Sequence, residues 1–280
     1  MSTGPGIRAL VTGLFDDAAV FPPGNAAVAI ALAEHRMHRD SWYGDLVGPL
    51  LLRASTVEEA LAVSDNRAGL AVVLVADAGL VELAEARNRL LDREEQLGLV
   101  GIEVALPPGE DPEQATRVLL DQLAFSVPAA IEVPRTGFIP ALDVLAADGV
   151  ERAKFRTGGE TPAAHPSEAE LAAFLHAAVA RRLAFKLTAG LHHPVRITTG
   201  AGLEQHGFLN VLAAVAAALA GGGAADLADV LARRNLDEVV PLLSVAPAAQ
   251  VRALFTSFGC CGVTDPIDHL VTAGLLSPEG

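Results

Sequence analysis

The chain alternates between short, continuous apolar runs and longer segments in which apolar residues recur every three or four positions. The clearest apolar runs are VGPLLLRAS (47–55), LAVVLVAD (70–77), LVGIEVALPP (99–108) and AAIEVPRTG (129–137), followed by two runs that each contain a lysine. Continuous apolar strands of this length are typical of a parallel sheet covered by helices on both faces. The pattern therefore predicts an α/β protein.

Helices are expected between these runs, at about 26–43, 79–96, 112–125 and 206–220. Asn25 can cap the first of them, and Ser167 begins a further helix with a clear period of 3.6 residues. His35 and His38 lie three positions apart on the first helix. With no acidic residue or cysteine to complete a ligand set, we expect them on a solvated face rather than at a metal.

The number of strands decides between two architectures. Six strands are clear, LVTGLFDD adds one at the front, and ALFTSFGCC (253–261) adds one at the back. Eight strands would close a TIM (β/α)8 barrel, whereas six would allow an open doubly wound sheet, for which the G-x-G-x-x-G signature is missing. We predict a single (β/α)8-barrel domain over 1–280, with a helical insertion at about 206–250 and extra C-terminal helices.

Composition narrows the range of partners. The net charge is −14 and only 4 % of residues are aromatic, so nucleic acid is not an expected partner. The longest apolar run, 211–220, is too short to span a bilayer, and residues 1–10 lack a signal-peptide layout. Cys260 and Cys261 are adjacent and indicate reduced thiols, to which we assign no role. We expect a cytoplasmic protein that can form a homo-oligomer.

The two lysines are the most informative residues of the chain. Lys154 and Lys186 are the only lysines, both near the ends of apolar runs, and each begins a Lys-x-x-x-Gly sequence that ends at Gly158 or Gly190. All 18 other Lys or Arg positions are arginine, which cannot form an imine or lose its proton near neutral pH. Chance could produce this pattern, but it favours amine chemistry.

Neighbouring barrel strands would place these two amines at the same height. Two ammonium groups that face each other lower one another's pKa, and a neutral lysine can attack a carbonyl to form a Schiff base. Carboxylates on the first and fourth strands, Asp16 and Glu103, could shuttle protons. We therefore expect a small-molecule carbonyl substrate, with Lys154, Lys186, Glu103 and Asp16 as the catalytic residues and no cofactor.

Further polar residues are expected at the same strand ends, where barrel enzymes bind their substrates. Three arginines among them could hold a carboxylate or a phosphate. The expected substrate-binding set is Asp17, Arg135, Arg156, Thr157, Gly158, Thr188, His192, His193 and Arg196.

The segment from about 150 to 196 resembles deoxyribose-phosphate aldolase. The likeness rests on KFRTGG (154–159), a helix of matching length, and FKLTAG (185–190). The resemblance implies reversible aldol chemistry through an imine without a metal, with Lys154 as the nucleophile and Lys186 as the group that lowers its pKa. Asp16 and Glu103 match acids of that family loosely, by strand position.

The chain departs from that family where phosphate would bind. GLHHPVR (190–196) stands in place of Gly-Gly and a nearby Arg, and SFG (257–259) is a poor substitute for a phosphate loop. Deoxyribose phosphate is therefore a doubtful substrate. The order FDDAAVFPP, KFRTGG, TAGLHHPVR, HGFLNVL also resembles a group of uncharacterised bacterial proteins, which carries no function over.

Two other interpretations remain open. A metal-dependent lyase, isomerase or hydrolase would use His192, His193 and His206 with Asp16 or Asp17 as ligands. Alternatively, the barrel is a non-catalytic binding module in which Lys154 forms a buried ion pair with Glu103 or Glu132.

Overall fold

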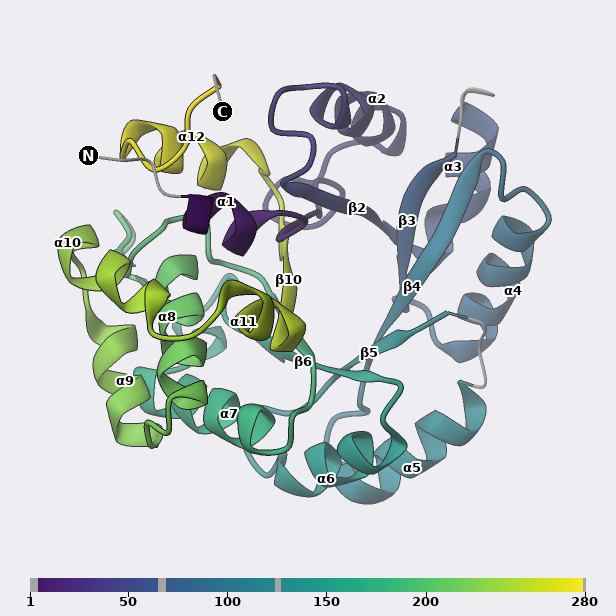
Figure 1. Ribbon diagram of the computed structural model, residues 1–280. Coiled ribbons are helices and arrows are strands. Elements are labelled where there is room, and N and C mark those ends of the chain that lie inside the picture. The colour runs from purple at the N-terminus through teal and green to yellow at the C-terminus, as the bar shows by residue number, and fades with distance from the viewer. Residues whose placement is uncertain (1–4, 65–68, 124–126, 279–280) are drawn as a thin grey trace.

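Eight parallel strands close into a barrel in the computed structural model, which describes residues 5–64, 69–123 and 127–278 (Figure 1). The strands pair in the order β1-β10-β7-β6-β5-β4-β3-β2, and β2 returns to β1. The strand bounds are β1 Phe15–Asp17, β2 Val47–Arg53, β3 Leu70–Val75, β4 Leu97–Ala105, β5 Ala129–Glu132, β6 Arg152–Arg156, β7 Phe185–Thr188 and β10 Phe255–Cys260. The predicted TIM-barrel fold is confirmed.

Helices cover the outside of the barrel. They are α1 Pro5–Val11, α2 Val28–Arg39, α3 Val57–Val63, α4 Leu80–Leu91, α5 Pro112–Gln122, α6 Ile139–Asp148, α7 Glu168–Ala180, α8 Phe208–Leu219, α9 Ala224–Ala232, α10 Leu236–Val239, α11 Ala248–Leu254 and α12 Thr264–Thr272. None of the described helices is long and apolar enough to cross a membrane.

Of two predicted helix N-caps, one is confirmed and the other is wrong. Ser167 caps α7 and forms a capping box with Glu170, as the sequence predicts. Asn25 does not cap α2: the cap position is Ala27, and Asn25 adopts a left-handed conformation with φ 47°. Asparagine tolerates this conformation unusually well, which is why the residue suits a turn as readily as a cap.

The connection between β7 and β10 is longer than any other in the barrel. It contains a short antiparallel hairpin, β8 Ile197–Thr198 and β9 Glu204–Gln205, which the sequence analysis does not predict, and then α8 to α11. Helix α11 runs directly into β10 and packs against α1, which precedes β1 (Figure 1). These two helices therefore lie at the N-terminal end of the barrel.

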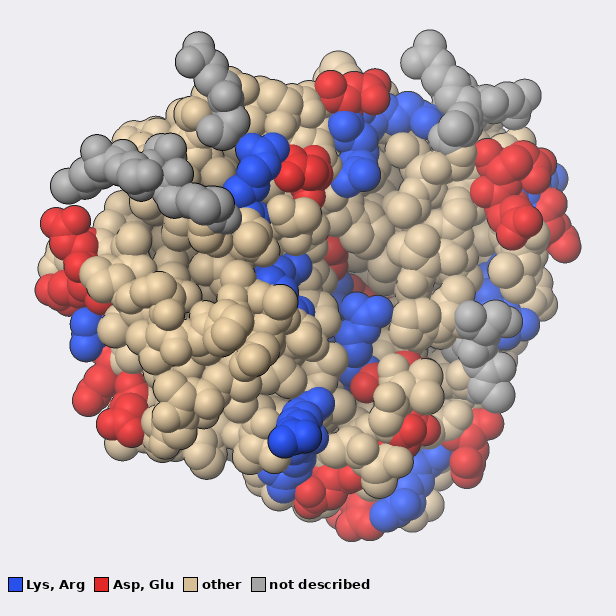
Figure 2. Space-filling model, viewed as in Figure 1, with Lys and Arg blue, Asp and Glu red and all other residues tan. Residues whose placement is uncertain are grey.

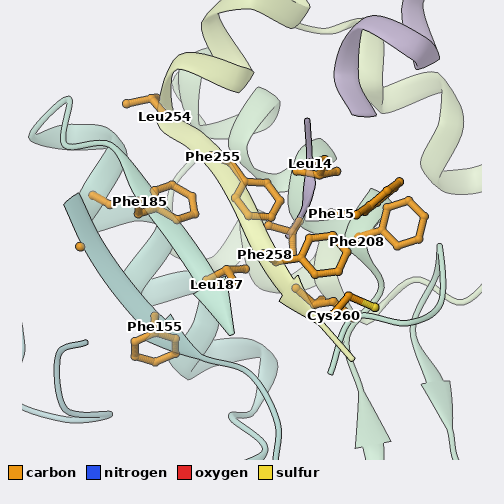
Figure 3. Packing of buried hydrophobic residues seen from close by; sticks show 14 of the residues in the cluster. Leu14, Phe15, Phe155, Phe185, Leu187, Phe208, Leu254, Phe255, Phe258 and Cys260 are labelled. Atoms are coloured by element: carbon orange, nitrogen blue, oxygen red, sulfur yellow. The ribbon is translucent and has the colours of Figure 1, made fainter. Parts of the chain in front are cut away.

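Phenylalanine rings fill the layer between the strands and the helices. Phe15 of β1 meets Phe208 of α8 and Phe258 of β10 edge-on, at 5.6 and 5.5 Å between ring centroids (Figure 3). Phe185 of β7 and Phe255 of β10 stack at 5.4 Å. Because side chains alternate along a strand, these outward rings leave the intervening positions pointing into the barrel.

Charged residues occupy both the surface and the interior. In Figure 2, side chains of both signs lie along the edges of the visible face and inside the hollow near its centre, with uncharged surface between them. Exposed charges are ordinary for a chain with net charge −14, but charges inside a barrel must have partners because burial disfavours the ionised form.

Candidate active site

A row of six charged side chains, alternating in sign, crosses the barrel interior; we call it the charged row. Each one comes from a strand and has at least one outward-facing neighbour in the hydrophobic core. In order of contact, the charged row consists of Asp16, Lys186, Glu103, Lys154, Glu132 and Arg156.

Lys154 lies between two carboxylates. Its Nζ is 2.6 Å from Oε2 of Glu103 and 3.0 Å from Oε2 of Glu132, and its side chain is only 5 % exposed. The Cα atoms of Lys154 and Lys186 are directly paired between β6 and β7, so the two lysines stand at the same height, as expected.

Lys186 is held on the other side of Glu103. Its Nζ donates hydrogen bonds to Oδ2 of Asp16, at 2.6 Å, and to Oε1 of Glu103. The hydroxyl of Ser257 donates to the same Asp16 oxygen, at 2.7 Å. Each buried charge in this part of the charged row therefore has at least one partner of opposite sign.

The Glu103 carboxylate lies between the two amines, and the pKa of Lys186 is raised, which corrects the expected lowering of the pKa at this lysine. Each ammonium contacts a different oxygen of the same Glu103 carboxylate. Burial favours the neutral form of Lys186, but the attraction of Asp16 and Glu103 outweighs it and raises the pKa of Lys186.

The three carboxylates differ in acidity. Burial raises the pKa of Asp16, and Lys186 only partly offsets this. Burial also opposes ionisation of Glu103, but Lys154 and Lys186 together lower its pKa to about 2. The pKa of Glu132 is lowered as well, because Lys154 and Arg156 outweigh its burial. Among these three carboxylates, Asp16 is thus the one that most readily accepts a proton.

A pocket of about 740 Å³ opens above Lys154 at the C-terminal ends of the strands. Its wall includes Glu103, Glu132 and Arg156. Lys186 instead lines a cavity of about 240 Å³ together with Asp16 and residues from the starts of strands. The charged row therefore separates the two cavities, and Lys154 faces the end of the barrel where substrates normally bind.

Four of the expected substrate-binding residues line this pocket: Arg156, Gly158, Thr188 and His192. Arg156 is 49 % exposed and pairs with Glu132 at 2.9 Å. Thr157 lies beside the pocket and turns away from it, since its hydroxyl donates to the backbone oxygen of Ala189 at 2.6 Å.

Two other expected residues bind neighbouring protein groups. Asp17 points outward from β1, because it follows the inward-facing Asp16, and pairs with the buried His35 of α2 at 2.9 Å. This also corrects the expected solvated position of His35. Arg135 lies beyond the end of β5 and forms a two-pronged pair with Glu170 of α7.

The remaining predicted residues likewise have partners outside the pocket wall. The ring of His193 packs against that of His269 of α12, with centroids 4.4 Å apart and the ring planes tilted by 53°. Arg196 is buried and pairs with Glu168 and Glu204, both at 2.9 Å. Of the three arginines in the predicted set, Arg156 is therefore the one that lines the pocket.

The histidines proposed as metal ligands do not converge. His206 is buried and its Nε2 contacts the backbone oxygen of Pro166 at 2.8 Å, whereas His192 and His193 turn toward α12. Within the described ranges, no three His, Cys, Asp or Glu side chains are arranged to hold a metal ion.

Sequence reasoning missed two small residues that shape the site. The sequence suggests Ser257 only as part of a phosphate loop, although alternation from Phe258 already turns it inward. Gly48 of β2 leaves room for Asp16: a Cβ atom there would lie 2.1 Å from the Asp16 Oδ1 atom.

The glycines of the two Lys-x-x-x-Gly sequences pack against each other. A Cβ atom on Gly158 would lie 3.1 Å from the backbone of Ala189 and Gly190, so the loops after β6 and β7 can approach this closely only with glycine there. The repeated motif therefore has a packing reason in addition to any chemical one.

Replacing Gly158 with alanine should lower the free energy of unfolding by about 1–3 kcal/mol, because the added methyl group meets backbone atoms that cannot rotate away. Equilibrium urea unfolding measures this. Gly200→Ala is the matched control, since nothing lies within 4 Å of a Cβ atom there. Equal losses in the two variants would show that the loops do not depend on this contact.

Comparisons with protein-family models, with curated proteins and with solved structures found no match.

Proposed function

We propose that the protein is a lyase that forms or breaks a C–C bond in a small polar carbonyl compound through a Schiff base on Lys154. The observation that carries the proposal is the position of Lys154: its amine is almost fully buried yet lines the large pocket at the C-terminal end of the barrel. Lys186, on the far side of Glu103, then serves as its electrostatic partner.

Lys154 must lose a proton before it can attack a carbonyl carbon. Glu103 contacts both lysines, and Lys186 contacts Asp16. If Lys186 gives its proton to Asp16, Glu103 can take the proton of Lys154 and pass it to the neutral Lys186 amine, which moves one net proton from Lys154 to Asp16. The raised pKa of Asp16 favours this direction. The freed amine adds to the carbonyl, water leaves, and the resulting iminium accepts the electrons of the breaking C–C bond.

The pocket wall favours a polar substrate with little charge. Arg156 and Glu132 already neutralise each other, while Thr188 and His192 supply neutral or protonated hydrogen-bonding groups. Because Arg135 and Arg196 are paired elsewhere, the pocket lacks the arginine cluster that a phosphorylated substrate would favour.

A non-catalytic binding protein is the second candidate. The observation that favours it is the pairing of Lys154 with both Glu103 and Glu132, since the same ion pairs would also hold a lysine in place permanently. In that case the pocket would bind a polar molecule without reacting with it.

Imine trapping distinguishes these candidates. We expect incubation with small aldehydes and 2-keto acids, followed by borohydride, to add to Lys154 in the intact protein the mass of one carbonyl compound less one oxygen atom, because water leaves and two hydrogens are added. Lys154→Arg should abolish this adduct, because arginine cannot form an imine. Since the chain has two lysines, peptide mapping assigns the adduct unambiguously.

Lys186→Arg is the companion variant: it keeps a cation at that site, but arginine cannot pass a proton on to Asp16, so trapping at Lys154 should become slower without being lost. A carbonyl compound that binds, shown by calorimetry, but is never trapped would support the binding module. Adduct formation that persists in Lys154→Arg would refute the assignment of the nucleophile.

A further inference from the structure

A second reactive group lies on the wall of the same pocket, where the loop after β7 meets the end of β10. Cys261 Sγ is 3.6 Å from Nε2 of His192, and Oδ2 of Asp265 is 2.9 Å from Nδ1 of the same ring. Both His192 and Cys261 line the pocket. A thiol on one ring nitrogen and a carboxylate on the other is the arrangement that activates cysteine nucleophiles.

The backbone is shaped to bring these groups together. Ala189, Gly190 and Leu191, immediately before His192, have φ values of 62°, 77° and 61°. Left-handed conformations are unfavourable for alanine and leucine, and consecutive ones persist only where the surrounding fold imposes them. The turn directs His192 toward the end of β10.

A glycine completes the approach of the carboxylate. A Cβ atom on Gly262 would lie 3.0 Å from Oδ2 of Asp265, the oxygen that contacts His192. The missing side chain at this position therefore lets the first turn of α12 reach the ring.

The adjacent Cys260 has a different environment. It is fully buried, its Sγ donates to the backbone oxygen of Gly262 at 3.2 Å, and it also lies 3.6 Å from Nδ1 of His192, the nitrogen that Asp265 contacts. Burial raises the pKa of the Cys260 thiol, so this residue keeps its proton. Cys261 is half-buried and faces the pocket.

We propose that Cys261 is a second nucleophile of the pocket: its thiol gives a proton to His192, which Asp265 orients, and the thiolate adds reversibly to the carbonyl carbon of a small aldehyde. In this step an S–C bond forms, the C=O π bond opens, and the oxygen takes the proton from His192. The product is a thiohemiacetal, with no leaving group and no change of oxidation state. The reaction does not depend on the Schiff base at Lys154.

The charges around His192 agree with this assignment. Its contacts with Cys260 and Cys261 raise the pKa of His192 to about 11, against the effect of burial. Asp265 adds a negative charge beside the ring. The neighbouring His193 has a pKa lowered by burial, by His269 and by His192 itself, so it does not add a competing positive charge at neutral pH.

Alkylation with iodoacetamide tests the activation of the thiol. At pH 6 we expect Cys261 in the folded protein to react at least on the order of 10-fold faster than in His192→Gln, because an unassisted thiol is almost wholly protonated there. Asp265→Asn should give an intermediate rate, and Cys260 should stay unmodified until urea is added. Peptide mapping assigns the label, and circular dichroism checks that each variant is folded.

Addition of carbonyl-¹³C acetaldehyde tests the chemistry. A thiohemiacetal carbon signal should appear in the NMR spectrum of the wild type and of Lys154→Arg, and should be lost in Cys261→Ser. Equal alkylation rates in the wild type and in both His192→Gln and Asp265→Asn would overturn the proposal, as would preferential labelling of Cys260 or a thiohemiacetal signal that survives in Cys261→Ser. Imine trapping at Lys154 is scored separately, so the two proposals can fail independently.

Discussion

Replacing Glu103 with glutamine should lower the free energy of unfolding by about 3–5 kcal/mol, the usual cost of removing one partner from a buried ion pair. Glu103 is 1 % exposed and contacts both Lys154 and Lys186. The amide keeps the size of the side chain but not its charge, so two ammonium groups would remain near each other with one partner fewer. Equilibrium urea unfolding at pH 7 measures the loss.

Asp143→Asn provides the control for removing a carboxylate at the surface. Asp143 is 61 % exposed and pairs with Arg181 at 2.7 Å, so its loss should change stability by no more than about 1 kcal/mol. If Glu103→Gln costs no more than this control, Glu103 does not stabilise the lysine pair.

The second large effect is acid destabilisation. The pKa of Glu103 is about 2 in the folded protein and 4.5 when unperturbed. Its pKa is lowered by folding, so its contribution to stability is complete above pH 4.5 and is lost as the pH falls toward 2. The difference corresponds to about 3 kcal/mol, which should appear as a decrease in the free energy of unfolding over this range.

The titration of Asp16 changes the free energy of unfolding in the opposite direction over part of the same pH range. Its pKa is raised from 3.8, so the folded state holds its proton more strongly and gains stability as the pH falls through the raised value. Subtracting the pH titration of Glu103→Gln from that of the wild type isolates the Glu103 contribution. A difference that stays constant between pH 5 and 2 would contradict the lowered pKa.

The barrel could be predicted because its strands are buried on both faces. Runs such as 47–55 and 70–77 contain too few polar residues for any solvent-facing position, and the alternation with helices then fixes parallel pairing. The hairpin at 197–205 was missed because each of its strands has two residues, too few for a period to be visible. Asn25 was misassigned because caps and left-handed turns share the same residue preferences.

The candidate site was predictable in its residues but not in its connections. The shared Lys-x-x-x-Gly sequence predicts that Lys154 and Lys186 stand level, and the structure pairs them. Alternation along β1 separates Asp16 from Asp17, although both were expected at the substrate. Sequence could not show that Glu103 reaches between the amines, because that depends on how far its side chain extends across the barrel from β4.

The close packing of Gly158 on Gly190 has a consequence for redesign of the pocket. The loop after β6 follows Lys154, and the loop after β7 leads into His192, so a longer residue or an insertion in one loop would displace the other. Changes of substrate range made there would have to be introduced on both loops at once. The opposite wall, formed by Val75 at the end of β3, Ala76 just after it and Ala105 at the end of β4, belongs to other strands than these two loops and is the better starting point for variation.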